Sequence, residues 1–589
     1  MRAIIRLTGL VAVPAAALAL AAPAAARAPS FAAPVRLPGA AAGDEPRVVV
    51  APDDRRYAIA NDDQTGEAVV YASSDRGATW RRTPSTFPGQ QAATIDTEIV
   101  VTRTGRLVAT ELDGAGLTFI TGYSDDRGRT WKSSTGTDLA DIDRPWLAVG
   151  PDDPATHQPR VYLLFHNLAS GVGQHNMFVS TSTDGGASFG PPAPLTLPGS
   201  QAYLDLQCSD SGAPSSLNVN PRSGEVYAVW GTRTSAAGGC GASVFGTPEA
   251  NVVGETRIWV ARSTDGSAGS WTDTLAADAG DKTVSASFEP GAVDRAGNVY
   301  VAYAETAHTY PDFARATVKY VSAPASLASW SKPHVVAPAG PIGHYDPSLV
   351  AGDRGELALA YYTGVPRSGK EPAWFVRSAL VHAADGGAPR VEESRVAGIP
   401  AYAQSANAMG GSCAEGPLAG LENGLACDRA SDDWGLALDS RCRLTVVFPT
   451  VKNDAHRSRA GTFASTQRSG GIPCRSPKTK LARRIKIEHL KGRASELDER
   501  WHRRGYVPLR AKTKHGRATG ATGVLYRLRH GKRIVVARTR HAVSLTTHAR
   551  TLRLFFVPGA RVVPGRYVSA VSATIAGRHV RRGRVFTLR

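Results

Sequence analysis

The sequence is poor in methionine and cysteine, and it has no long stretch with a helical period. Three Met and six Cys stand beside 60 Gly and 38 Pro among 589 residues. Glycine and proline break helices, so this composition excludes a helical bundle and is typical of strands joined by tight turns. The cysteines match no zinc-site spacing, and the histidines form no HExxH pattern. The sequence therefore predicts an all-β protein with no metal site and no cofactor.

Long apolar runs are missing beyond the first residues. The apolar run at 4–20 follows Arg2 and Arg6 and precedes the small residues at 24–26. This is the pattern of an export signal, and Pro14 and Pro23 interrupt a run already short for a membrane anchor. We therefore predict a signal peptide at 1–26, no transmembrane segment, and a secreted protein, either free or attached to the cell wall or surface.

The few cysteines are even in number, and in an exported chain that predicts disulfide bonds. Chain order suggests the pairs Cys208–Cys240, Cys413–Cys427 and Cys442–Cys474. Other pairings of these six residues remain open.

Acidic residues nearly disappear after residue 474. The last 115 residues hold 30 Lys and Arg but four acids, which is a net charge of +26. The preceding chain holds the other 39 of the 69 bases and 47 of the 51 acids, which is a net charge of −8. We therefore predict a mildly acidic body at 27–474, a basic linker at 475–505, and a basic β-sandwich module, resembling small immunoglobulin-like domains, at 506–589. A disordered basic tail is the alternative. Such a surface attracts anionic extracellular polymers, and we predict no sequence-specific binding of nucleic acid.

A short motif, S-x-D-x-G-x-[TS]-[WF], occurs four times in the body. Its Ser and Asp oxygens close a turn, its Gly supplies a positive φ, and its aromatic ring is buried beside the turn. The fixed positions of the pattern are Ser73, Asp75, Gly77 and Trp80; Ser124, Asp126, Gly128 and Trp131; Ser182, Asp184, Gly186 and Phe189; and Ser263, Asp265 and Trp271, the last copy with one extra residue.

Each motif copy ends a unit of apolar strands, and seven such strand units recur before residue 474. The motif resembles the Asp-box, or BNR repeat, of the bacterial sialidase superfamily, which implies a β-propeller with the boxes on its outer rim. Seven units predict seven four-stranded blades. Known sialidases are six-bladed, so six remains the alternative. Residues 31–39 resemble the strand that follows the third box, which predicts that the N-terminus closes the last blade.

The resemblance also implies a site. Sialidases clamp the substrate carboxylate with three Arg, and they use a Tyr activated by a Glu as nucleophile and an Asp as acid. Their first Arg lies in an F/Y-R-I-P stretch, but here the corresponding residues are Glu45-Pro46-Arg47-Val48. The arginine clamp is therefore not matched.

A second pattern comes from the residues themselves. Acids precede the inner strand in five of the seven units, a place that rings one mouth of a propeller channel. Convergent carboxylates can act as acid and base, bind a cation, or hold sugar hydroxyls; the alternative is that each caps its own turn. The candidate catalytic residues are Asp143, Arg144, Glu289, Tyr345, Asp346 and Asp433, with Tyr345 as the candidate sialidase-like nucleophile. Trp146 and Trp434 can stack on a sugar or be buried between blades.

Three functions follow from these predictions. The first is a monomeric, secreted propeller that binds extracellular glycans or glycoconjugates and attaches to anionic surfaces through its basic module. The second is an active exo-sialidase or other glycoside hydrolase. The third is a propeller that binds a protein partner, because the fold serves many functions.

Overall fold

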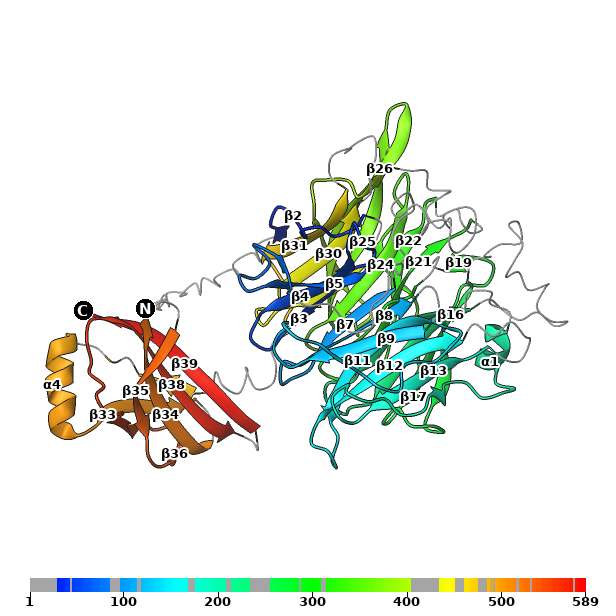
Figure 1. The fold of residues 1–589 in the computed structure, drawn as a ribbon. Coiled ribbons are helices and arrows are strands. Elements are labelled where there is room, and N and C mark those ends of the chain that lie inside the picture. Colours follow the sequence, from blue (N-terminus) through cyan, green and yellow to red (C-terminus); the bar gives the residue numbers. More distant parts are fainter. Residues whose placement is uncertain are drawn as a thin grey trace, which may run out of the picture.

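The structure is a computed structural model in two parts (Figure 1). In the part of the chain that it describes, seven sheets of four or five strands follow one another from Ser30 to Ser469, and an eight-stranded sheet follows. The described residues are 29–42, 45–84, 96–113, 118–167, 175–207, 213–232, 255–284, 288–308, 314–403, 434–450, 460–474, 485–488, 490, 493–514, 518–529, 532–575 and 578–589.

Each of the seven sheets is an antiparallel blade whose strands follow one another from the inside of the ring to the outside. Blades 1 and 2 are β3 (Arg47–Val50), β4 (Arg56–Asn61), β5 (Ala68–Ser73) and β6 (Arg81–Arg82), then β7 (Thr97–Val101), β8 (Leu107–Asp113), β9 (Thr118–Ser124) and β10 (Lys132–Ser133). Blades 3 and 4 are β11 (Ile142–Asp152), β12 (Pro159–Asn167), β13 (Met177–Ser182) and β14 (Ala193–Pro194), then, after helix α1 (Gln201–Leu206), β15 (Pro214–Val219), β16 (Val226–Thr232), β17 (Arg257–Ser263) and β18 (Thr272–Asp278).

The remaining blades carry extra strands. Blade 5 is β20 (Gly291–Val293), β21 (Val299–Thr306), β22 (Thr317–Ala323) and β23 (His334–Ala337), with β19 (Thr283–Val284) beside β21. Blade 6 is β24 (His344–Ala351), β25 (Glu356–Arg367), β26 (Lys370–His382) and β27 (Arg390–Arg395), with β28 (Tyr402–Ala403) beside β26. Blade 7 is β29 (Gly435–Leu438), β30 (Leu444–Thr450) and β31 (Gly461–Ser469). The seven-blade prediction is confirmed, and the six-blade alternative is wrong.

The second strands bury both faces because neighbouring blades cover them. Every residue of β4, β8, β16 and β30 is buried. One core cluster joins Tyr57 and Ile59 of blade 1 to Ile99 and Leu107 of blade 2. Apolar residues therefore follow one another in these strands, as at 57–60 in β4, and do not alternate strictly with polar ones.

The N-terminal residues close the ring. Strands β1 (Ser30–Phe31) and β2 (Val35–Arg36) pair with β31, so that Ser30 lies opposite Ser469 and Val35 opposite Ala464. Figure 1 shows β2, in blue, beside the yellow β31. Inner strands β29 and β3 then contact each other as the other inner neighbours do. The predicted closure of the last blade by the N-terminus is confirmed.

The four Asp-boxes join the third strand of blades 1 to 4 to the outer strand. In the second box, the Gly128 N–H donates to Ser124 Oγ at 2.8 Å, and the Thr130 N–H donates to Asp126 Oδ1 at 2.9 Å. That backbone bond and further side-chain bonds lower the pKa of Asp126 to about 2. Each box glycine faces the preceding blade: a Cβ at Gly186 would lie 2.7 Å from Val108. Asp-boxes therefore set the spacing between blades.

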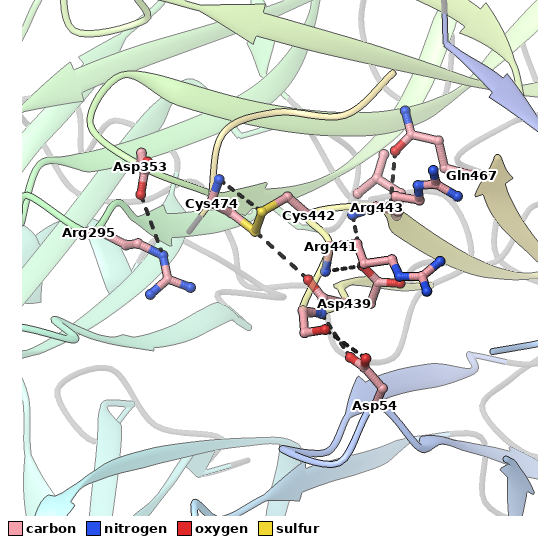
Figure 2. The surroundings of a disulfide bond; sticks show 11 residues. Asp54, Arg295, Asp353, Asp439, Arg441, Cys442, Arg443, Gln467 and Cys474 are labelled. Carbon is pink, nitrogen blue, oxygen red and sulfur yellow. Dashed lines mark hydrogen bonds and ion pairs between the residues drawn. A yellow bond between two sulfur atoms is a disulfide. The ribbon is translucent and has the colours of Figure 1, made fainter. Parts of the chain in front are cut away.

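A disulfide ties the end of the propeller to its last blade (Figure 2). Cys442, in the turn between β29 and β30, is bonded to Cys474, which follows β31. The preceding Pro473 carbonyl accepts from the Asp353 N–H of blade 6 at 2.6 Å. The predicted Cys442–Cys474 pair is confirmed; Cys208, Cys240, Cys413 and Cys427 lie outside the described residues, as does Asp433.

The basic module is an ordered, nearly closed β-structure. Its strands run in the order β32-β33-β37-β35-β34-β38-β39, with β36 beside β34. The bounds are β32 (Ile485–Ile487), α4 (Ala494–Arg504), β33 (Val507–Thr513), β34 (Ala518–Arg529), β35 (Lys532–Thr539), β36 (Val543–Leu545), β37 (Arg550–Phe556), β38 (Gly565–Ile575) and β39 (Arg578–Leu588). The segment predicted as a linker contains β32 and α4, and Trp501 of α4 belongs to the module core.

Candidate functional site

The starts of the seven inner strands gather at one end of the propeller axis, because every blade begins at the axis and runs in the same direction. We call this end the mouth. Its described polar side chains precede or open these strands and come from Glu45, Arg47, Asp96, Glu98, Asp143, Arg144, Ser215, Glu289, Tyr345 and Asp346.

Three inner strands, β11, β15 and β24, shift register at the mouth, and candidate residues occupy the shifts in β11 and β24. The register of β11 shifts between Asp143 and Trp146, and that of β24 shifts between Tyr345 and Ser348. Arg144 and Asp346 occupy these bulges with φ of 59° and 47°, in the left-handed region that non-glycine residues rarely adopt. Each precedes a proline. Bulges of this kind re-aim a side chain, and here they occur at equivalent places in two blades.

Arg144 joins three blades. Its Nη1 lies 2.8 Å from Glu45 Oε2, ahead of β3, and also contacts the carboxylate of Asp96, ahead of β7. Its guanidinium also lies over the ring of Phe288, with Cζ 4.9 Å from the centroid. Arg144 therefore holds two protein carboxylates.

Arg47 forms a parallel arrangement. Its Nε is 3.6 Å from Glu98 Oε2, and its Cζ lies 4.2 Å from the centroid of the Trp146 ring. The Trp146 indole N–H donates to the Pro214 carbonyl at 2.6 Å, and its ring meets the Phe288 ring edge to face. Trp146 remains partly exposed, so this aromatic ring reaches solvent at the mouth.

Asp143 is the exposed end of a buried polar chain. Its Oδ2 is 3.5 Å from His166 Nε2; His166 Nδ1 is 3.0 Å from His175 Nε2, and His175 Nδ1 is 3.3 Å from the Leu206 carbonyl of α1. Burial would raise the pKa of Asp143, but hydrogen bonding from His166 and the charge of Arg144 outweigh it and lower that pKa. Burial and His166 lower the pKa of His175 to about 3, so His175 is neutral. The Asp143 side chain, 25% exposed, is a carboxylate.

A second carboxyl pair lies between blades 4 and 5. Glu255, ahead of β17, and Glu289, ahead of β20, are 5% and 0% exposed, and Ser215 Oγ donates to Glu289 Oε2 at 2.7 Å. Burial first, and then the charge of Glu289, raise the pKa of Glu255 well above its usual range; burial also raises the pKa of Glu289. The pair therefore keeps a proton. Gly231 leaves room for it, since a Cβ there would be 1.7 Å from Glu255 Oε2.

The blade 6 candidates are buried in an aromatic cluster. Tyr345 is 2% exposed and belongs to the core that contains Tyr362 and Trp434. The Trp434 indole N–H donates to the Asp346 carbonyl at 3.1 Å. Trp434 is 1% exposed, so it is buried between blades and does not stack on a sugar.

The structure thus brings Asp143, Arg144, Glu45 and Asp96 together, whereas Tyr345 and Asp346 lie on blade 6. Sequence reasoning missed Glu255 and the histidine chain. Glu255 lies just ahead of β17, the third strand of blade 4. The sequence pattern marked only acids ahead of inner strands, so it could not point to Glu255. The direct pairing of Asp143 with His166 depends on the register of β11 and β12.

Fold and mouth together define an Asp-box β-propeller. Residues 46–322 match the family model of the BNR repeat-like domain. Among curated proteins no match was found.

Solved structures share the fold at low identity. An alpha-L-arabinanase from Penicillium chrysogenum, complexed with arabinobiose, is 11% identical over 75% of this chain and 99% of its own, with a TM-score of 0.37. A protein of unknown function from Dyadobacter fermentans is 10% identical over 75% and 100%, with a TM-score of 0.39. The NanB sialidase from Streptococcus pneumoniae is 12% identical over 74% and 70%, with a TM-score of 0.34.

Two kinds of feature are absent from the described residues. None of their helices is long and apolar enough to cross a membrane. They also contain no group of three or more His, Cys, Asp or Glu that could hold a metal ion.

Proposed function

We propose that the chain binds an extracellular glycan at the mouth and attaches to an anionic surface through its basic module. The observation that carries the first part is the meeting of Arg144, Glu45 and Asp96 from three blades beside Asp143 and the partly exposed Trp146. Carboxylates accept hydrogen bonds from sugar hydroxyls, and they are the groups at the mouth that a glycan would contact first.

The charge of the mouth favours a neutral glycan over an acidic one. In the described segments that open the inner strands, arginine occurs at 47 and 144, and both side chains hold protein carboxylates. Asp143 adds a further negative charge. A sialic acid carboxylate would have to compete with these acids, so the exo-sialidase alternative has the weaker support.

A glycan array with the full chain tests this proposal, with Asp143→Asn as the variant. Asp53→Asn is its control, because Asp53 lies in the β3–β4 turn at the other end of blade 1. We expect wild-type binding to neutral glycans, roughly tenfold weaker binding by Asp143→Asn from the loss of a charge-assisted hydrogen bond, and no change in the control. Equal binding by both variants would contradict the proposal. Capture of a protein with no glycan bound would favour a protein-binding propeller.

Hydrolysis of a glycosidic bond is a second candidate, favoured by the carboxyl pair. Glycosidases combine a protonated carboxyl with a carboxylate; here Asp143 is the carboxylate, and the Glu255–Glu289 pair keeps a proton but is buried, so that hydrolysis requires this pair to become accessible to the substrate. The test is release of 4-methylumbelliferone from a panel of neutral glycosides and a sialoside. Turnover that Glu289→Gln abolishes would support hydrolysis of the glycoside concerned. Silence across the panel would leave binding alone, and turnover of the sialoside would contradict the charge argument.

A further inference from the structure

One face of the basic module carries exposed arginines and a single acid, Glu488, at its edge. Arg538 lies directly opposite Phe555, and Arg510 lies opposite Thr551, so these residues share the outer side of β35, β37 and β33. We call this surface the arginine face; its members are Arg510, Arg533, Arg538, Arg540, Arg553 and Arg581, with Tyr506, Tyr526 and Phe555.

The strands alternate so that the opposite side of the same sheet is apolar. Leu509, Leu552 and Leu554 point into the module core, whereas all six arginines of the face are exposed. No Asp or Glu occurs between residues 500 and 589. Apart from Glu488 at the β32 edge, 3.5 Å from Arg510, the described strands offer these guanidiniums no acidic partner.

Four of the six guanidiniums lie over aromatic rings. Arg540 Cζ lies 4.4 Å from the Phe555 centroid, and Arg553 Cζ lies 5.2 Å from that of Tyr506. Arg581 and Arg533 both lie over Tyr526. Contact with a ring orders a flexible side chain, and the N–H groups that remain free can match planar or multi-oxygen anions in pairs; one of them, Arg581 Nη2, donates to the Tyr526 hydroxyl.

We propose that the arginine face binds a linear anionic polysaccharide through its carboxylate or sulfate groups. This inference deepens the attachment role proposed above and depends on it. The arginine face spans six neighbouring strands, from β33 to β39, which is about 24 Å measured along the curved sheet at the usual strand spacing, and this extent suits a polymer rather than a single small anion. Because arginines cover the rings, bases have no open aromatic surface on which to stack, so a single-stranded nucleic acid fits less well.

Binding of the full chain to heparin, polygalacturonate and duplex DNA, each at the same ionic strength, tests the inference. Heparin carries sulfates and polygalacturonate carries carboxylates, so the two arms separate the possible groups. We expect Arg538→Gln/Arg553→Gln to weaken polysaccharide binding roughly tenfold. The matched control is Arg503→Gln/Arg504→Gln on α4, which removes the same charge from exposed residues outside the face and should have a smaller effect.

A third variant separates recognition from net charge. Arg538→Lys/Arg553→Lys keeps the charge but loses the paired donors, and we expect it to bind more weakly than wild type. Wild-type affinity in this variant, or equal loss in the α4 control, would overturn the inference. Tighter binding to DNA than to both polysaccharides would replace it by a nucleic-acid surface. Asp143→Asn changes the mouth and should leave heparin binding by the basic module unchanged. A test that contradicts glycan binding at the mouth can therefore be told apart from one that contradicts polysaccharide binding by the arginine face.

Discussion

The proton shared by Glu255 and Glu289 makes the stability of the contact between blades 4 and 5 depend on pH. Both carboxyls are buried, and the two raised pKa values mean that the folded protein keeps a proton that the unfolded chain releases above about pH 4.5. The folded state therefore loses stability as pH rises from that value toward the folded pKa.

Glu255→Gln should reverse this loss. The amide needs no proton and can donate to Glu289, so we expect the variant to be more stable than wild type at pH 8, by at least about 1 kcal/mol, with a smaller difference at pH 4. Thermal unfolding at the two pH values measures the effect.

Glu225→Gln provides the control of opposite sign. Burial would raise the pKa of Glu225, but hydrogen bonds from Ser223 and Arg262 outweigh it and lower the pKa. That glutamate therefore adds stability above its unfolded pKa, which is lost as pH falls through the lower folded pKa, and its amide variant should be less stable at pH 8. If Glu255→Gln behaved like Glu225→Gln, the shared proton would be ruled out.

At the scale of the element, the Asp-box acts as a spacer as well as a turn. Gly186 has φ of +86° and faces Val108 of the preceding blade, whereas Gly199, in the loop before α1, has φ of +90° and open space around it. The two glycines therefore share the backbone requirement and differ in packing.

Gly186→Ala should be the more damaging of the two substitutions. We expect Gly199→Ala to cost about 1–2 kcal/mol for its backbone conformation, and Gly186→Ala to cost about 1–3 kcal/mol more because its Cβ overlaps Val108. Urea unfolding of both variants measures the difference. Equal losses would mean that the box glycines serve the turn alone.

The elements were predictable to the extent that they repeat. Asp-boxes and paired apolar runs indicated the blades, and the likeness of residues 31–39 to a later outer strand indicated the closure. Blade 5 strand β19 and helix α1 have no counterpart in the repeat, so no periodicity marked them.

Within the mouth, the acids ahead of inner strands were evident from the sequence, but the ion pair of Arg144 with Glu45 joins residues 99 apart. Only the curvature of the ring brings them together.

At the scale of the whole molecule, the Cys442–Cys474 bond fastens the closing blade. The disulfide, drawn in Figure 2, spans a sequence separation of 32. Beside it, the Pro473 carbonyl accepts a hydrogen bond from blade 6. Asp54 of blade 1 accepts from Ser440 in the same turn, so blades 6, 7 and 1 meet here.

Replacing both cysteines by alanine should cost about 2–4 kcal/mol, because the unfolded chain gains the freedom that the bond removes. We expect a lower thermal midpoint for this double variant and for the wild type in reductant. An unchanged midpoint, with mass spectrometry confirming an open bond, would contradict the expectation.

The composite last blade also imposes an order in time. Ser30 finds its partner in Ser469, 439 residues further along the chain. Strand β1 is therefore made long before its partner and must wait, unpaired, until nearly the entire propeller has been translated. Strand pairing across so long a separation is slow, and until it occurs the outer edge of β31 stays open. Blades 1 to 6 can assemble in sequence as the chain is made, but the ring itself is completed in one late step, by strands β1 and β2.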